Sequence, residues 1–385
     1  MRVLVTSTPG TGHAYPIMPF AKALRDRGHE VLWAVAEDGR DLVRRHGFEV
    51  AVAGMTVAER GAFLQPQFAD ILSGPPRLRR GRLFAGLFAQ AAAPKMVSDL
   101  GAIFDRFRPE VVVHETAEQG AAPHAVAHGV PHVTVAYSGA LPDDAVPMAE
   151  AALAPVWESL RLPPPTMSDL AGDVYFHPFA KSMGQASNLH QSCEMRPLNV
   201  TEDHGDVPEW IAALGRDRPA IYVTAGTTPI VATLAPWREM FDAFSSLDVD
   251  VLATIGPQFP IDGLGPIPAN VRVERFVAQE LVLERVALVV SHAGAGTMLA
   301  SACAAIPQLV IPTWADQWEN ADAIVRTGAA IVLEENHRDS ASIHAAASAL
   351  LEHAEYRFAA TQLSAEILAM PSPADHVDTL ERLVQ

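Results

Sequence analysis

The sequence has little cysteine and no long hydrophobic run. Cys193 and Cys303 are its only cysteines among 385 residues, too few for a disulfide framework and without metal-ligand spacing. An uncharged stretch, residues 219–237, holds three prolines and four threonines, whereas a membrane-spanning helix needs about 20 mostly apolar residues. The opening MRVLVTSTPGTGH lacks the longer apolar core of a signal peptide. We therefore expect a cytoplasmic protein without stable membrane insertion.

Basic residues are also scarce. Lys and Arg total 28 against 45 Asp and Glu, which leaves a formal net charge of −17. An acidic chain is poorly suited to binding polyanions, so we expect no nucleic-acid partner. With 49% hydrophobic and 19% charged residues the composition is globular. At roughly 150 residues per domain, the length predicts about two or three domains.

Short apolar strands alternate with helices in two parts of the chain. In the first part we predict strands at 2–6, 30–36, 110–114 and 130–137, and helices at 17–27, 41–46 and 117–128. Residues 139–218 are rich in proline and are expected to be irregular. The alternation then restarts, with strands at 220–224, 249–255, 288–291 and 308–312 and a helix at 235–244.

Nearly all-apolar strands separated by helices indicate parallel sheets that are covered on both faces. We therefore predict an α/β fold with two doubly wound, Rossmann-like domains. The N-terminal domain would span residues 1–200 and the C-terminal domain residues 219–370. A linker at 201–218 and a final segment at 371–385 complete the division.

Two polar positions follow strands of the first domain, where open parallel sheets bind their ligands. Gly10, Thr11 and Gly12 form a small-residue turn, and His13 stands near the start of the following helix. Glu115 follows the strand at 110–114. A carboxylate beside an imidazole fixes its tautomer and stabilises its protonated form, which suits general-base chemistry. The alternative is two unrelated polar loop residues.

The second domain carries a more specific pattern. Thr227 follows its first strand in AGTT, and the segment SHAGAGT at 291–297 follows a later strand and opens a helix. Small residues let backbone N–H groups approach an anion, and a helix N-terminus favours negative charge. Diphosphate is the expected ligand. A tight structural turn would explain the glycines but not the adjoining His292 and Thr297.

These segments together resemble nucleotide-sugar-dependent glycosyltransferases of the GT-B fold, particularly the bacterial natural-product type. The resemblance covers nearly the whole chain and rests on GTGH at 10–13, FVAQ at 276–279, SHAGAGT at 291–297 and ADQ at 315–317. It implies two domains that face each other across a cleft, the first binding the acceptor and the second the donor. It also implies inversion at the anomeric carbon, without a cofactor, a metal or a covalent intermediate. The final helix, 371–385, would pack back on the first domain.

The resemblance also implies roles for single residues. His13 would be the general base, supported by the loop Gly10, Thr11 and Gly12, with Glu115 as its carboxylate partner where many relatives carry Asp. The remaining roles concern the donor. Diphosphate binding falls to Thr227, His292, Gly294, Ala295, Gly296 and Thr297; nucleobase binding to Phe276, Val277 and Gln279; and sugar binding to Asp316 and Gln317.

Position 300 bears on the nucleotide. Plant relatives carry a Glu there that contacts the ribose, whereas this chain has Ala300, which favours dTDP over UDP. The expected partners are thus a dTDP-sugar donor and an apolar, polyketide-like or aromatic acceptor, with a homodimer left open. Other interpretations stay open as well: a UDP-sugar-dependent transferase, a sugar-nucleotide epimerase, a non-catalytic nucleotide-binding activator, and a nicotinamide or flavin enzyme.

Three further patterns are given a structural interpretation. Asp248 and Asp250 form a DxD pattern but are expected at a solvated turn that enters a strand, away from the ligand-binding edge. His124 and His128 share a helix face without a third metal ligand. The run of Arg77, Arg79, Arg80 and Arg82 is expected to be a solvated loop.

Overall fold

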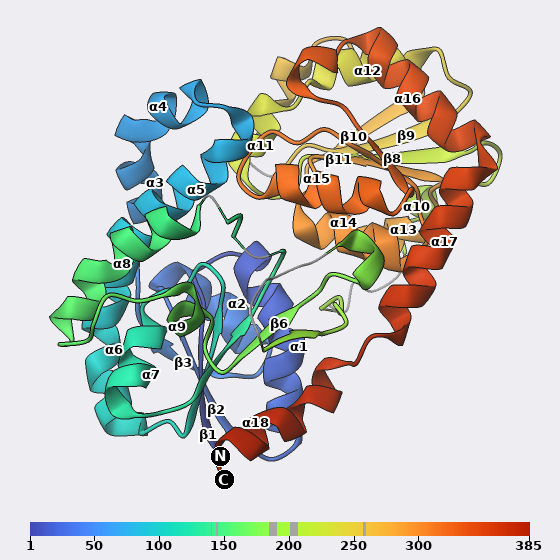
Figure 1. Ribbon diagram of the computed structural model, residues 1–385. Coiled ribbons are helices and arrows are strands. Elements are labelled where there is room, and N and C mark those ends of the chain that lie inside the picture. Colours follow the sequence, from blue (N-terminus) through green and yellow to red (C-terminus); the bar gives the residue numbers. More distant parts are fainter. Residues whose placement is uncertain (140, 144, 185–190, 201–206, 257–258) are drawn as a thin grey trace. The chain divides into compact units, whose positions relative to one another are not determined.

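The computed structural model describes residues 1–139, 141–143, 145–184, 191–200, 207–256 and 259–385 (Figure 1). The chain divides into two compact units. Unit 1 comprises Met1–Phe179, Gln185–Val200 and Met370–Gln385, and unit 2 comprises Ala180–Gly184 and Thr201–Ala369. No helix of the described residues is long and apolar enough to cross a membrane.

Unit 1 is built on a seven-stranded parallel sheet in the order β3-β2-β1-β4-β5-β6-β7. Its strands are β1 (Arg2–Thr6), β2 (Glu30–Val35), β3 (Glu49–Val52), β4 (Val111–Glu115), β5 (His132–Val135), β6 (Val174–His177) and β7 (Ser192–Glu194). The helices that bear on the site are α1 (Thr11–Asp26), α3 (Val57–Leu64), α5 (Arg79–Leu83), η4 (Phe84–Ala92), α6 (Ala93–Phe107) and α7 (Ala121–His128).

The remaining helices of unit 1 are α2 (Arg40–Arg45), α4 (Phe68–Ser73), α8 (Val146–Ser159), α9 (Met167–Ala171) and α18 (Val377–Leu383).

Both faces of this sheet are covered because successive side chains of a strand point to opposite faces. In β1, Val3 and Val5 belong to one buried cluster, which α1 and α18 complete. Leu4 belongs to another, which α6 and α7 complete. The sheet therefore has a core layer on each side, which accounts for its nearly all-apolar strands.

Unit 2 repeats this plan with a six-stranded parallel sheet in the order β10-β9-β8-β11-β12-β13. Its strands are β8 (Ala220–Thr224), β9 (Asp250–Thr254), β10 (Val271–Glu274), β11 (Leu288–Ser291), β12 (Gln308–Val310) and β13 (Ala330–Val332). Its helices are α10 (Glu209–Ala213), α11 (Pro229–Leu234), α12 (Trp237–Ser245), α13 (Gln279–Leu283), α14 (Ala295–Cys303), α15 (Gln317–Arg326), α16 (Ser340–Glu352) and α17 (Ala354–Ala369). The prediction of two doubly wound parallel sheets is confirmed.

The strand order places the candidate site in each unit. The direction of winding reverses between β1 and β4 in unit 1 and between β8 and β11 in unit 2. Loops at such a reversal diverge and leave a crevice beyond the carboxyl ends of the strands. Register pairs Thr6 with His114 in the first sheet and Thr224 with Ser291 in the second. The loops that follow these residues, with the first turns of the helices α1 and α14 that come next, carry most of the site residues expected from the sequence.

The segment 139–218 is more regular than expected. It contains α8, α9 and two strands of the sheet, β6 and β7. Of the expected linker, residues 201–206 lie outside the described residues, whereas α10 packs in unit 2 through Trp210 and Ile211. At the other end of the chain, α18 packs on the core of unit 1 through Val377 and Leu380.

Candidate functional site

His13 and Glu115 lie together at the carboxyl edge of the unit 1 sheet. The Nδ1 atom of His13 is 3.2 Å from Oε1 of Glu115. His13 is the third residue of α1, which begins after Gly10 at a φ of 117°, a conformation that favours glycine. Glu115 is the last residue of β4. The structure thus brings together the two residues that the sequence suggested as a pair.

The Glu115 carboxylate is fully buried and held by its neighbours. Its Oε1 accepts hydrogen bonds from the backbone N of Thr8, at 3.1 Å, and from Thr8 Oγ1, at 2.9 Å. Its Oε2 accepts one from the backbone N of Ala117 at 2.5 Å. Burial alone would raise the pKa of Glu115, but the His13 imidazole and these donors outweigh it and hold the pKa below its ordinary value. Glu115 is therefore a charged acceptor at neutral pH.

Aromatic rings flank His13. The ring of Tyr137 lies 5.2 Å from the imidazole and that of Phe88 5.8 Å, both edge to face. The His13 side chain retains 22% of its exposure, so the base is partly open to solvent. An imidazole held in this way can exchange a proton with a hydroxyl that approaches its free nitrogen.

The expectation of a solvated arginine loop was wrong for Arg79 and Arg80, whereas Arg77 and Arg82 are exposed as expected. Arg79 and Arg80 are 8% and 5% exposed and lie in α5. Arg80 donates from Nη2 to the Gly139 carbonyl at 2.8 Å. This guanidinium therefore joins α5 to the loop after β5, which a charge pattern alone does not reveal.

Sequence reasoning missed Glu118, in the same loop as Glu115. Glu118 is 2% exposed, and its carboxyl accepts hydrogen bonds from Thr6 Oγ1 and from the backbone N of Gly120 at 2.6 Å. Burial raises its pKa to about 7, and the charge of Glu115 adds to the rise. Two neighbouring carboxyl groups thus have opposite preferences, Glu115 for the charged form and Glu118 for the neutral one.

In unit 2 the imidazole of His292 lies between two glycines. An added Cβ would be 2.3 Å from Nε2 of His292 at Gly294 and 2.7 Å from its Cε1 at Gly226. Ala293, between His292 and Gly294, adopts a left-handed backbone conformation with φ of 63°, which costs energy for a residue with a side chain. Burial lowers the pKa of His292 to about 4, partly offset by the Thr224 carbonyl and the charge of Asp316. His292 is therefore neutral at neutral pH without a ligand.

The first turn of α14 has open space in front of it. An added Cβ at Gly296 would meet no protein atom within 4 Å. Thr297 Oγ1 lies 3.4 Å from Oε1 of Gln279, so the first turns of α13 and α14 are adjacent. Ala295 is buried, while Thr227 is exposed in the loop after β8. This edge combines a helix N-terminus, a hydroxyl and uncrowded backbone, which suits an anionic group.

The residues after β10 differ sharply in exposure. Phe276 is 65% exposed, one of the most exposed large apolar side chains among the described residues. Val277 packs against the core of unit 2. The pair therefore anchors the segment through one side chain and leaves a free aromatic face on the other, which is suited to stacking on a flat ring.

Asp316 and Gln317 are used largely within their own loop. Gln317 Oε1 accepts from Thr313 N at 2.7 Å, Thr313 Oγ1 at 3.1 Å and Trp314 N at 2.8 Å. Asn320, which the sequence analysis missed, donates to the Ala293 carbonyl at 3.0 Å and to Asp316 Oδ2 at 2.9 Å. Asn320 thus ties this loop to the His292 loop.

The DxD pattern and the histidine pair, which were given a structural interpretation, have partners within the fold. Arg218 pairs with Asp250 at 2.6 Å and with Asp248 at 3.6 Å. His124 donates from Nε2 to the Val97 carbonyl at 2.8 Å, and His128 from Nδ1 to the His124 carbonyl at 2.8 Å. Within the described ranges, no three His, Cys, Asp or Glu side chains gather as a metal site would require.

Comparisons with known proteins agree with this arrangement. Residues 238–383 match the family model of the erythromycin biosynthesis protein CIII-like C-terminal domain. L-demethylnoviosyl transferase from Streptomyces niveus is 31% identical over 386 residues, covering 97% of this chain and 96% of that protein. TDP-daunosamine transferase DnrS from Streptomyces peucetius is 26% identical, covering 100% and 97%. The solved structure of spinosyn rhamnosyltransferase SpnG superimposes with a TM-score of 0.82 at 25% identity, covering 99% and 100%.

Proposed function

Since the chain belongs to the family of bacterial natural-product glycosyltransferases with the GT-B fold, we propose that it moves a deoxysugar from a dTDP-sugar to a hydroxyl group of an apolar aglycone. The aglycone would be polyketide-like or aromatic. The donor would bind unit 2 and the acceptor unit 1. The reaction would invert the anomeric carbon, with His13 as the general base and no metal or covalent intermediate.

The observation that carries the proposal is the contact between His13 and Glu115. A carboxylate can only accept, so the proton of a neutral imidazole belongs on Nδ1, which leaves Nε2 as the free base. Nε2 takes the acceptor's hydroxyl proton as the acceptor oxygen bonds to the anomeric carbon. The bond from that carbon to the diphosphate breaks, and the diphosphate leaves with the electron pair. The charged Glu115 stabilises the imidazolium that forms.

The departing diphosphate gains negative charge, and groups of unit 2 would meet it. The first turn of α14, with open space before Gly296, supports a phosphate position there. Thr297 and His292 would add donors. Donors placed in advance where charge develops are worth about a hundred- to a thousandfold in rate each. Phe276 would stack on the nucleobase, and Asp316 would face the sugar.

Two observations support dTDP rather than UDP. Ala300 is buried in the core of unit 2, so this position offers no carboxylate to a ribose 2′-hydroxyl. TDP also stands in the name of the daunosamine transferase, a relative along its whole length.

Thermal-shift measurements with dTDP and UDP at equal concentrations test this choice. We expect dTDP to raise the Tm more than UDP, because at equal concentrations the ligand with the lower Kd stabilises the folded protein more. A ligand at a hundred times its Kd stabilises by about 2.7 kcal/mol. A larger shift with UDP would contradict the proposed donor.

A further inference from the structure

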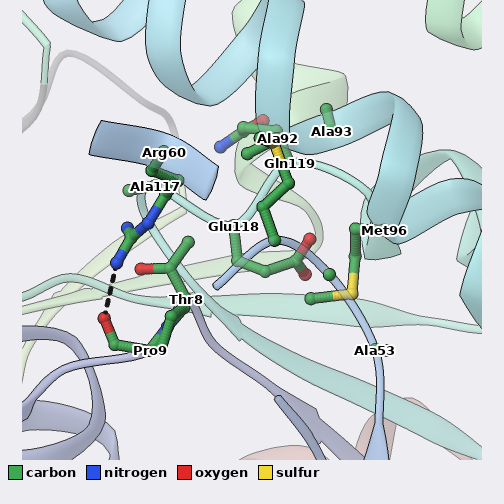
Figure 2. A pocket seen from close by; sticks show the side chains of 12 residues that line it. Thr8, Pro9, Ala53, Arg60, Ala92, Ala93, Met96, Ala117, Glu118 and Gln119 are labelled. Carbon is green, nitrogen blue, oxygen red and sulfur yellow. Dashed lines mark hydrogen bonds between the residues drawn. The ribbon is translucent and has the colours of Figure 1, made fainter. Parts of the chain in front are cut away.

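A small pocket lies beside the His13–Glu115 pair in unit 1, at the edge where the sheet reverses its winding. Its walls come from the loops after β1, β3 and β4 and from α3, η4 and α6. Alanine and methionine side chains, among them Met55 and Met96, make it largely apolar. Figure 2 shows Met96 and the alanines around the polar groups. The space suits one small substituent rather than a ring.

Arg60 brings a positive charge to this pocket, which the buried Glu118 carboxyl also lines. Arg60 is 9% exposed, and its Nη2 donates to the Pro9 carbonyl at 2.8 Å (Figure 2). Among the described residues, its buried Nε has no hydrogen-bond partner. Burial lowers the pKa of Arg60, and Glu115 and Asp38 compensate only in part. A buried guanidinium with a donor to spare favours a ligand that accepts and that tolerates negative charge.

Gln119 offers the opposite function in the same pocket. It is 4% exposed, and its amide nitrogen donates to the Thr116 carbonyl at 2.6 Å. Its buried Oε1 has no partner in the part of the chain that the structure describes. The pocket therefore combines an unused donor with an unused acceptor. Thr8, which also lines it, donates to Glu115 and so connects the pocket with the pair described above.

We propose that this pocket binds a second, acidic hydroxyl group of the acceptor, phenolic or enolic, distinct from the hydroxyl that receives the sugar. Such a group accepts from Arg60 Nε and donates to Gln119 Oε1. An ether cannot donate and a carboxylate ion has no proton to give, whereas a phenol or enol in its neutral form offers both functions. The inference rests on the proposed function, because it names the class of acceptor.

Binding of 4-nitrophenol and of 4-nitroanisole, without donor, tests this inference. The two compounds differ at one position, where a methyl group in 4-nitroanisole replaces the hydroxyl hydrogen, and the phenolate form of 4-nitrophenol has its own absorbance band. In buffer just below the pKa of free 4-nitrophenol, we expect the wild type to bind it about tenfold more tightly than the anisole. We also expect the phenolate absorbance to decrease on binding, because the bound hydroxyl keeps the proton that it donates to Gln119 Oε1. Equal affinities, or no binding of 4-nitrophenol, would overturn the inference.

Variants locate the site of binding. Arg60→Met should remove the preference for 4-nitrophenol, and Gln119→Leu should reduce it, so the inference stays testable if either variant fails to fold. Arg44→Met, the same change at an exposed arginine of unit 1, serves as the control. A preference that survives in Arg60→Met but is lost in His13→Ala would overturn the assignment. Stabilisation by dTDP is measured on every protein, because its absence in the wild type would count against the proposed function and not against this pocket.

Discussion

Nδ1 of His13 lies 3.2 Å from Oε1 of Glu115, although the two residues are 102 positions apart in the sequence. Parallel pairing of β1 with β4 produces this contact, because it brings the loops after both strands to one edge of the sheet. The same carboxylate is bonded by Thr8 and Ala117. A fixed, charged partner of this kind sets the tautomer of the imidazole.

Glu115→Gln keeps the shape of the side chain and removes its charge. An amide stabilises the imidazolium less and can present an N–H to Nδ1, which favours the wrong tautomer. We expect kcat to fall by about a hundredfold or more, with the affinity for the donor unchanged. Glu49→Gln, at an exposed glutamate of the same unit, is the control. A kcat within twofold of the wild type would show that the carboxylate is not needed.

Gly296→Ala separates ligand contact from folding. The new Cβ meets no protein atom within 4 Å, so the helix should gain about 0.5–1 kcal/mol from losing a glycine. We expect the free energy of unfolding to rise while the Kd for dTDP-glucose increases about tenfold, since the methyl group occupies the phosphate position. Gly61→Ala in α3 is matched, because Gly61 has equally open space. It should stabilise unit 1 without affecting donor binding. If Gly296→Ala binds the donor as tightly as the wild type does, the phosphate does not bind at this turn.

The affinity for dTDP-glucose should depend on pH through His292. Burial holds the pKa of the free imidazole at about 4, and a diphosphate beside it would favour the protonated form and raise that value. Binding then takes up a proton, so the affinity increases as the pH falls from the pKa of the complex toward about 4. We expect a roughly tenfold gain from about pH 8 to about pH 6.

A sugar nucleotide is the appropriate ligand for this experiment, because dTDP has a terminal phosphate that titrates in the same range. His292→Asn should bind more weakly and with no such pH dependence. His337→Asn, at an exposed histidine of unit 2, should keep the wild-type profile. The same slope in wild type and His292→Asn would show that another group takes up the proton.

Glu118 should make stability depend on pH. Its pKa is raised from 4.5 to about 7 in the folded protein, so the folded state binds the extra proton between these values. Stability therefore declines as the pH rises through this window and levels off above about pH 7, by up to about 3 kcal/mol. Glu118→Gln removes the contribution. We expect denaturation experiments to show that the free energy of unfolding of Glu118→Gln, relative to that of the wild type, is higher at about pH 8 than at about pH 5. Glu30→Gln, on an exposed side chain, should show no such difference. Parallel pH profiles for wild type and Glu118→Gln would refute the raised pKa.

The sequence was most informative where a single segment carries the whole signal. β1, β8 and β11 begin and end at the predicted residues, because each is a run of apolar side chains bounded by small or polar residues. Five strands were missed: β3, β6, β7, β10 and β13. β6 is a short strand in proline-rich surroundings, and β7 has only three residues and exists through its pairing with β6.

The site residues follow the same rule. The pairing of His13 with Glu115 was predictable because both stand at strand ends of a parallel sheet. Asn320 was not, because its two partners come from different loops that meet only in the folded unit. The burial of Arg80 was not predictable either, since its acceptor, the Gly139 carbonyl, is 59 residues away. Local pattern identifies the edge of the sheet, and tertiary contacts decide which side chains face it.

The most direct test of the account is sugar transfer by the single change His13→Ala, with donor binding measured on the same protein. The acceptor would be the best substrate of the wild type from a panel of aromatic and macrolactone aglycones, and the donor a dTDP-sugar. We expect turnover to fall by about 10²–10⁴-fold, while the Kd for the donor stays within twofold. Turnover at the wild-type rate would contradict the assignment of His13 as the base and, with it, the mechanism proposed for this protein.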